Sequence, residues 1–223
     1  MPKISKLGKI RKLETYVKKG GLATIEALVT PLILILLSPW LLNKIGIEAF
    51  GQWTLALAMS GFTHIVSLGS SVATMHSIAE LDTKEKDVNF TDIINAGLII
   101  TATTSIIAIL VALCIAEEVA SNYLSKIGEA RLVETLLVQG IVALAIQEID
   151  SLYAGVLRGI QRYDLIAKLE ITSRPMWALM IVTCTELTGN VIYILYTHNL
   201  YLTIRLLIRI LIVKKTLRSY KFS

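Results

Sequence analysis

Long apolar runs dominate this chain and constrain its fold more than any other feature. Six of them, separated by short polar segments, occupy most of the 223 residues. Residues 49–79 and 93–116 contain no Asp, Glu, Lys or Arg. A helix that crosses a bilayer needs about 20 mainly apolar residues, so these runs are long enough to span. The sequence therefore predicts an all-α integral membrane protein rather than a soluble globular core.

The composition agrees, since 54% of the residues are hydrophobic and 17% are charged, which is more apolar than an ordinary globular domain. We expect a polytopic six-helix transmembrane bundle with spans at residues 21–42, 53–73, 93–116, 136–157, 169–187 and 191–213. The fifth span has the shortest uncharged stretch, and a single span over residues 175–197 is the alternative. Two helices are preferred because Thr188, Gly189 and Asn190 form a turn signal between apolar runs.

Basic residues are concentrated on one side of the predicted bundle. Most of the 22 Lys and Arg residues fall in four segments, at residues 3–19, 84–86, 158–168 and 214–221. The opposite side has only Lys44, Lys126 and Arg131. Because Lys and Arg are enriched in cytoplasmic loops, both termini are expected in the cytoplasm.

Three parts follow from this pattern: a basic arm at residues 1–20, the bundle at residues 21–213 and a basic tail at residues 214–223. Apolar residues recur every third position along the arm, at Ile4, Leu7, Ile10 and Leu13. This spacing is typical of a helix lying on an anionic leaflet, and it equally fits a solvated leader that sets topology. The net charge of +5 therefore indicates membrane topology and contact with lipid, and not binding of nucleic acid.

Motifs of soluble enzymes and metal sites are missing from the sequence. Cys114 and Cys184 each lie inside an apolar run, which is typical of packing residues, and no CxxC spacing occurs. No HExxH, phosphate-binding GxxxxGK[ST] or GxSxG motif is present. The sequence thus indicates neither an enzyme nor a site for a metal or cofactor.

Ionisable residues inside the predicted spans are the most informative positions for function. They are Glu26, Glu148, Asp150, Glu170, Arg174, Arg205 and Arg209. A central Asp, Lys or Arg costs about 2.5 to 3.5 kcal/mol on insertion scales, so such residues usually face a partner or a water-filled cavity. Counting from the predicted ends places most of them in the cytoplasmic half. A protein that collects an anionic substrate from the cytoplasm would need cations there.

The spacing of these charges predicts how they pair. Glu170 and Arg174 lie four apart with the acid first, so they either neutralise each other or share a substrate site. Pro175 follows and is expected to bend the helix. Glu148 and Asp150 are about 200° apart around a helix and cannot face the same cavity.

The two arginines of the sixth span have different expected roles. Arg209 lies near the inner boundary and is expected to extend to water, as long basic side chains do. Arg205 lies deeper and is the better candidate for a buried cation.

Several segments carry a resemblance to a known family. Residues 42–55, LNKIGIEAFGQWTL, lead into a helix that ends with SLGSSVA at residues 67–73, and a charged loop at residues 80–87 follows. GVLRGIQRYD at residues 155–164 and the segment at residues 205–215 continue the pattern. In order and spacing these segments resemble the polysaccharide flippases, which include the O-antigen translocases, a branch of the multidrug and oligosaccharide-lipid exporter superfamily.

The resemblance covers most of the chain and implies two six-helix bundles around a central cavity. Such a protein turns undecaprenyl-pyrophosphate-linked sugar repeats from the inner to the outer leaflet of the bacterial inner membrane. This chain stops at Ser223, soon after the sixth helix, so it would supply one bundle, and a second six-helix lobe or a second copy would supply the other. Unlike the related lipid II flippases, its first two helices contain no Arg, so Arg174 and Arg205 would recognise pyrophosphate.

Three functions remain open from the sequence. In a flippase half, the expected substrate-binding residues are Arg174, Arg205, Glu26, Asp150, Glu148 and Glu170. A cation-coupled multidrug exporter of the same superfamily would use Glu26 and Asp150 as proton sites. The third possibility is a non-transporting, truncated membrane protein. Cations and polar groups in the cavity favour the first, whereas aromatic and acidic residues favour the second.

Overall fold

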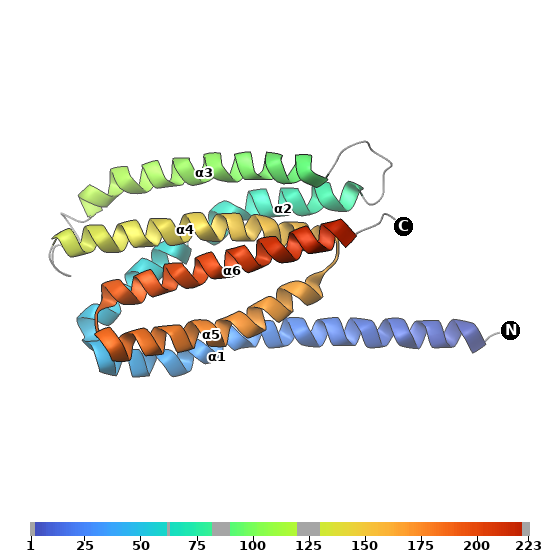
Figure 1. Cartoon of the computed structure of the whole chain (residues 1–223), viewed down its shortest axis with the longest axis horizontal. Coiled ribbons are helices and arrows are strands. Elements are labelled where there is room, and N and C mark those ends of the chain that lie inside the picture. Colours follow the sequence, from blue (N-terminus) through green and yellow to red (C-terminus); the bar gives the residue numbers. More distant parts are fainter. Residues whose placement is uncertain (1–2, 62, 82–89, 120–129, 220–223) are drawn as a thin grey trace.

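The computed structural model describes residues 3–61, 63–81, 90–119 and 130–219, and every regular element in these ranges is a helix. The helices are α1 (Lys3–Gly61), α2 (Thr63–Leu81), α3 (Phe90–Val119), α4 (Ala130–Gly159), α5 (Tyr163–Thr188) and α6 (Val191–Ser219). They lie side by side along one long direction (Figure 1). The predicted all-α fold is confirmed for this part of the chain.

Three stretches of the described helices are long and apolar enough to cross a membrane, namely Ala27–Ala58, Phe90–Ile107 and Thr135–Gly159. Large apolar side chains are also exposed on several helices, among them Leu36, Ile47, Ile99, Leu179 and Leu187. Acyl chains would cover such side chains favourably, whereas water would not. The fold therefore has the character of a membrane-associated protein.

Gly46 turns the chain within α1. Its φ of 81° and ψ of 168° interrupt the helix, and glycine adopts such a positive φ without steric cost. Beyond Gly46 the chain runs back towards α2 (Figure 1). The predicted spans at residues 21–42 and 53–73 imply a loop between them, but Asn43 is helical because Gly46 alone is enough to change the chain direction.

The predicted arm and the first predicted span form one helix, since α1 begins at Lys3. The second predicted span, at residues 53–73, covers the end of α1 up to Gly61 and the start of α2 from Thr63, and residue 62 lies outside the described residues. Contact of the arm with lipid stays a prediction.

The turn predicted between the last two helices is confirmed. Gly189 has a φ of 59°, and its N–H donates to the carbonyl of Thr185, which ends α5. The side-chain oxygen of Asn190 accepts a hydrogen bond of 2.9 Å from the N–H of Ile192 and caps the start of α6. The alternative of a single span over residues 175–197 is therefore wrong. α5 remains helical through Pro175 and bends along its length (Figure 1).

One end of the bundle brings together the end of α2, the start of α3, the end of α4, the start of α5 and the end of α6 (Figure 1). We call it the basic end, because Arg158, Arg162, Lys168 and Arg218 lie in these helix ends and their connections. The kink at Gly46 and the turn between α5 and α6 lie at the opposite end (Figure 1).

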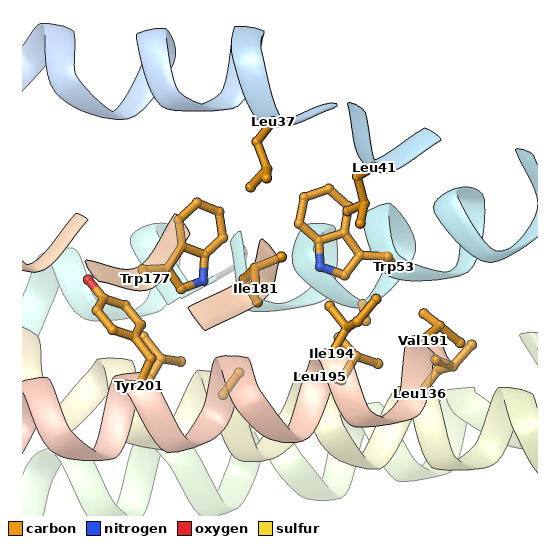
Figure 2. Close-up of a cluster of buried hydrophobic side chains, with 13 residues drawn as sticks. Leu37, Leu41, Trp53, Leu136, Trp177, Ile181, Val191, Ile194, Leu195 and Tyr201 are labelled. Atoms are coloured by element: carbon orange, nitrogen blue, oxygen red, sulfur yellow. The ribbon is translucent and has the colours of Figure 1, made fainter. Parts of the chain in front are cut away.

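Two apolar clusters form the core. The first joins α1, α4, α5 and α6 and includes Leu37, Leu41, Trp53, Leu136, Trp177, Ile181, Val191, Ile194, Leu195 and Tyr201 (Figure 2). The second lies nearer the basic end and consists of Ile78, Val156, Leu157, Ile160, Ile166 and Val213. Trp53 and Trp177 are the largest side chains of the first cluster, and both are almost fully buried.

α2 and α4 approach closely at Gly155. The Ser71 hydroxyl donates a hydrogen bond of 2.9 Å to the carbonyl of Ser151. A Cβ atom added at Gly155 would lie 2.5 Å from the carbonyl oxygen of Ser71, a distance that backbone atoms do not tolerate. The absence of a side chain at Gly155 therefore sets the spacing of these helices.

We expect Gly155→Ala to lower the free energy of unfolding by about 1 to 3 kcal/mol, because the methyl group must push α2 away from α4. Thermal unfolding of the purified chain in detergent measures the effect. Gly51→Ala is the matched control, since Gly51 is also helical and a Cβ there meets open space. Equal midpoints for the two variants would contradict the close contact.

Candidate functional site

Five charged side chains from three helices meet in one group, which we call the arginine cluster: Asp150, Glu170, Arg174, Arg205 and Arg209. Asp150 accepts hydrogen bonds from Nη2 of Arg205 at 2.8 Å and from Nε of Arg209 at 2.6 Å. Glu170 accepts from Nη2 of Arg209 at 2.6 Å and from Nε of Arg174 at 3.2 Å. Nη1 of Arg205 also lies 3.5 Å from Glu170.

Helical spacing explains why these residues can meet. Arg205 and Arg209 are one turn apart and therefore lie on one face of α6, as Glu170 and Arg174 do on α5. α4 contributes Asp150, and each of its two carboxylate oxygens binds one arginine of α6. Asp150 thus bridges two arginines, and Glu170 contacts all three.

Arg209 corrects a prediction made from the sequence. Its expected extension to water is wrong, because only 1% of the residue is exposed and its guanidinium binds both acids. The acids on the two neighbouring helices accept hydrogen bonds from Nε and Nη2 of Arg209, while its buried Nη1 has no hydrogen-bond partner among the described residues. Arg205 is buried as predicted, with 7% exposed.

The cluster has an excess of positive charge, since three guanidinium groups face two carboxylates. Arg174 is its most accessible member, with 29% of its side chain exposed. Only Nε of Arg174 forms a hydrogen bond to another described residue. Its terminal nitrogens are therefore the donors best placed to bind an anion that approaches the cluster.

Aromatic and hydroxyl groups connect the cluster to the first apolar cluster. The guanidinium carbon of Arg205 lies 5.7 Å from the ring centre of Tyr201, a cation–π distance. The Tyr201 hydroxyl donates to Ser173 at 3.2 Å, and Nε1 of Trp177 donates to Nδ1 of His198 at 2.9 Å. Figure 2 shows Trp177 and Tyr201 next to each other in this region.

The charges form a layer between the two apolar clusters. Along α6 the order is Tyr201 in the first cluster, the two arginines, then Val213 in the second. α5 shows the reverse order, from Ile166 through Glu170 to Trp177. Apolar packing on both sides fixes the register of the helices that carry the charges.

The predicted site residues separate into three groups. Asp150, Glu170, Arg174 and Arg205 come together in the arginine cluster. Glu148 is fully buried, but it does not join the ion pairs of the cluster. Glu26 lies on α1 outside the residues whose side chains the structure describes.

Sequence reasoning missed Arg209 as a member of the site. The available signal was its spacing of four from Arg205, which places both arginines on one helix face. Within the described residues, no group of three or more His, Cys, Asp or Glu side chains could hold a metal ion.

Comparison of the chain with protein-family models, with curated proteins and with solved structures finds no match. Function is therefore inferred from the geometry of the arginine cluster and from the resemblance seen in the sequence.

Proposed function

We propose that the chain is a six-span lobe of a flippase that carries polyprenyl-pyrophosphate-linked oligosaccharide repeat units across the bacterial inner membrane, with both termini in the cytoplasm. The observation that supports this most is the excess of guanidinium groups in the arginine cluster, with Arg174 partly exposed. An excess of buried cation in a membrane protein favours an anionic ligand.

Pyrophosphate suits the arginine cluster chemically. Guanidinium groups bind phosphate oxygens through paired, charge-assisted hydrogen bonds. Arg174 would make the direct contact, because its terminal nitrogens are not used by the acids of the cluster. Arg205 and Arg209 would add positive potential while the acids hold them in place.

The depth of the cluster fits collection of a substrate from the cytoplasm. Asp150 lies about 13 Å along α4 from Gly159 at a rise of 1.5 Å per residue. Gly159 belongs to the basic end, which we expect at the cytoplasmic face because Lys and Arg are enriched there. The cluster would therefore lie in the inner half of the proposed bundle.

Transport by alternating access requires two bodies that rock against each other around a substrate site. The chain supplies one such body, and a second six-helix lobe or a second copy would form the opposite wall. Membrane lipid would cover the remaining apolar faces.

The alternative of a drug exporter relied on Glu26 and Asp150 as proton sites. Asp150 binds two guanidinium groups at 2.8 Å and 2.6 Å, so it acts in the structure as an ion-pair partner. A pair of this kind favours the anion-binding function over exchange of a proton at Asp150. Glu26 lies outside the described side chains and supports neither function.

Arg174→Ala is expected to weaken binding of a short-chain polyprenyl-pyrophosphoryl N-acetylhexosamine by about tenfold or more, because a hydrogen bond to a charged group contributes about 1.5 to 3 kcal/mol. Binding is measured on the purified chain in lipid nanodiscs. Arg174→Lys should retain part of the affinity through its charge. Arg162→Ala is the control, since Arg162 is exposed and pairs with Asp164 outside the cluster.

Two comparisons decide between the functions. A ligand with the same lipid and sugar but no pyrophosphate should bind weakly and should not respond to Arg174→Ala. Binding of the cation ethidium in its place would favour the drug exporter. Binding of none of these ligands would support a membrane protein without transport activity.

A further inference from the structure

Among the acids of α4 whose side chains the structure describes, Glu148 is the one that lies outside the arginine cluster. Its exposed fraction is 0%, and neither carboxylate oxygen has a hydrogen-bond partner among the described residues. A charged carboxylate without a partner is among the most costly groups to bury, so proteins neutralise it or bind a cation there.

Two hydroxyl groups on α3 are also buried without a hydrogen-bond partner in the described part of the chain. Thr101 is fully buried, Ser105 is nearly so, and the hydroxyl oxygen of each has no hydrogen-bond partner among the described residues. Other threonines in the protein donate to the carbonyl four residues earlier, as Thr103 and Thr104 do on the same helix. The hydroxyls of Thr101 and Ser105 are therefore available to another group.

The packing of α3 against α4 places Thr101 level with Glu148, and Ser105 lies one turn further along α3. A Cβ atom on Gly97 would lie 2.8 Å from Cδ1 of Leu152, so these two residues are in contact. The two helices run in opposite directions (Figure 1). Thr101 is one turn after Gly97, and Glu148 is one turn before Leu152, so both lie about 6 Å further along in the same direction.

The charged groups that the structure describes on the neighbouring helices are engaged or exposed elsewhere. Arg205 and Arg209 of α6 bind Asp150, which is on the opposite side of α4 from Glu148, and Glu170 and Arg174 of α5 belong to the same cluster. Arg158 of α4 donates to the Ser71 hydroxyl of α2 at 3.3 Å. Of the other described titratable groups, His76 and Glu80 on α2 and Asp92 on α3 are exposed. At the far end, Lys44 on α1 pairs with Glu186.

We propose that Glu148, together with Thr101 and Ser105, binds a single monovalent cation, either H⁺ or Na⁺. One positive charge neutralises the buried carboxylate, and a carboxylate with two hydroxyls is an all-oxygen set that a hard cation accepts. A proton would satisfy one carboxylate oxygen and leave the other as an acceptor for a hydroxyl. This site is separate from the arginine cluster and does not depend on the proposed flippase function.

The test is modification of the purified full chain in detergent by dicyclohexylcarbodiimide, which reacts with protonated carboxyl groups in apolar surroundings. Peptide mass spectrometry locates the product. We expect severalfold more modification at Glu148 than at Asp150, the matched acid on the same helix that is held by two arginines. Glu148→Gln should remove the product while the variant elutes like the unchanged chain in size-exclusion chromatography.

Two conditions distinguish the cations. If H⁺ binds, modification falls as pH rises and does not change when Na⁺ replaces choline. If Na⁺ binds, Na⁺ lowers the modification severalfold at constant pH. Modification of Glu148 no greater than that of Asp150, or modification that neither pH nor Na⁺ changes, would overturn the proposal.

Discussion

Asp150→Ala is expected to lower the free energy of unfolding by about 3 to 5 kcal/mol, the usual effect of removing one partner from a buried ion pair. The change leaves Arg205 and Arg209 without the carboxylate that binds both of them. Among the described residues, Glu170 is then the one acid that pairs with these two guanidinium groups, and it already binds Arg174. Thermal unfolding in detergent, followed by intrinsic fluorescence, measures the loss.

The control is Asp164→Ala, which removes an acid from an exposed pair at the basic end. Arg162 and Asp164 are 3.0 Å apart, and the hydrogen bond from Arg162 lowers the pKa of the Asp164 carboxyl. Exposed pairs of this kind contribute about 1 kcal/mol or less. Similar losses for the two variants would show that the arginine cluster is not buried as described.

Arg209→Ala should destabilise the chain by a similar amount, about 3 to 5 kcal/mol, because it leaves Asp150 and Glu170 each short of a hydrogen-bonded cation. This is the opposite of what a side chain extending to water would show. The same unfolding measurement applies, with Arg218→Ala as the control at the exposed end of α6.

A double-mutant cycle makes this second prediction more specific. Asp150→Ala and Arg209→Ala together should cost less than the sum of the single changes, because contacting charges are coupled. Additive losses would mean that the two residues act independently, against the hydrogen bond of 2.6 Å between them.

Much of the fold could be predicted from local sequence patterns. Apolar runs predicted the helices, and the Thr188, Gly189 and Asn190 signal predicted the turn, because both depend on neighbouring residues. The kink at Gly46 was not predicted. A change of chain direction between two spans usually takes a loop of several residues, whereas here the chain is helical on both sides of a single glycine.

Most residues of the arginine cluster could be predicted from the sequence, but the ion pairs between them could not. Burial cost alone selected Asp150, Glu170, Arg174 and Arg205, since each is expensive in a membrane and needs a partner. The partners could not be assigned, because they come from helices far apart in the sequence. Arg209 is the clearest example. Its short distance from the helix end predicted a side chain that extends to water, whereas in the structure it binds two acids from other helices.

The charge layer between the two apolar clusters also has a consequence for biosynthesis. Asp150 and Glu170 precede Arg205 and Arg209 in the chain, so a ribosome delivers the acids to the membrane before these two arginines. Two arginines near the middle of α6 would each add about 2.5 to 3.5 kcal/mol to its insertion if it entered lipid alone. In the proposed six-span bundle, α4 and α5 would provide the counter-charges for α6, so we expect membrane insertion of α6 to depend on the correct placement of these two helices.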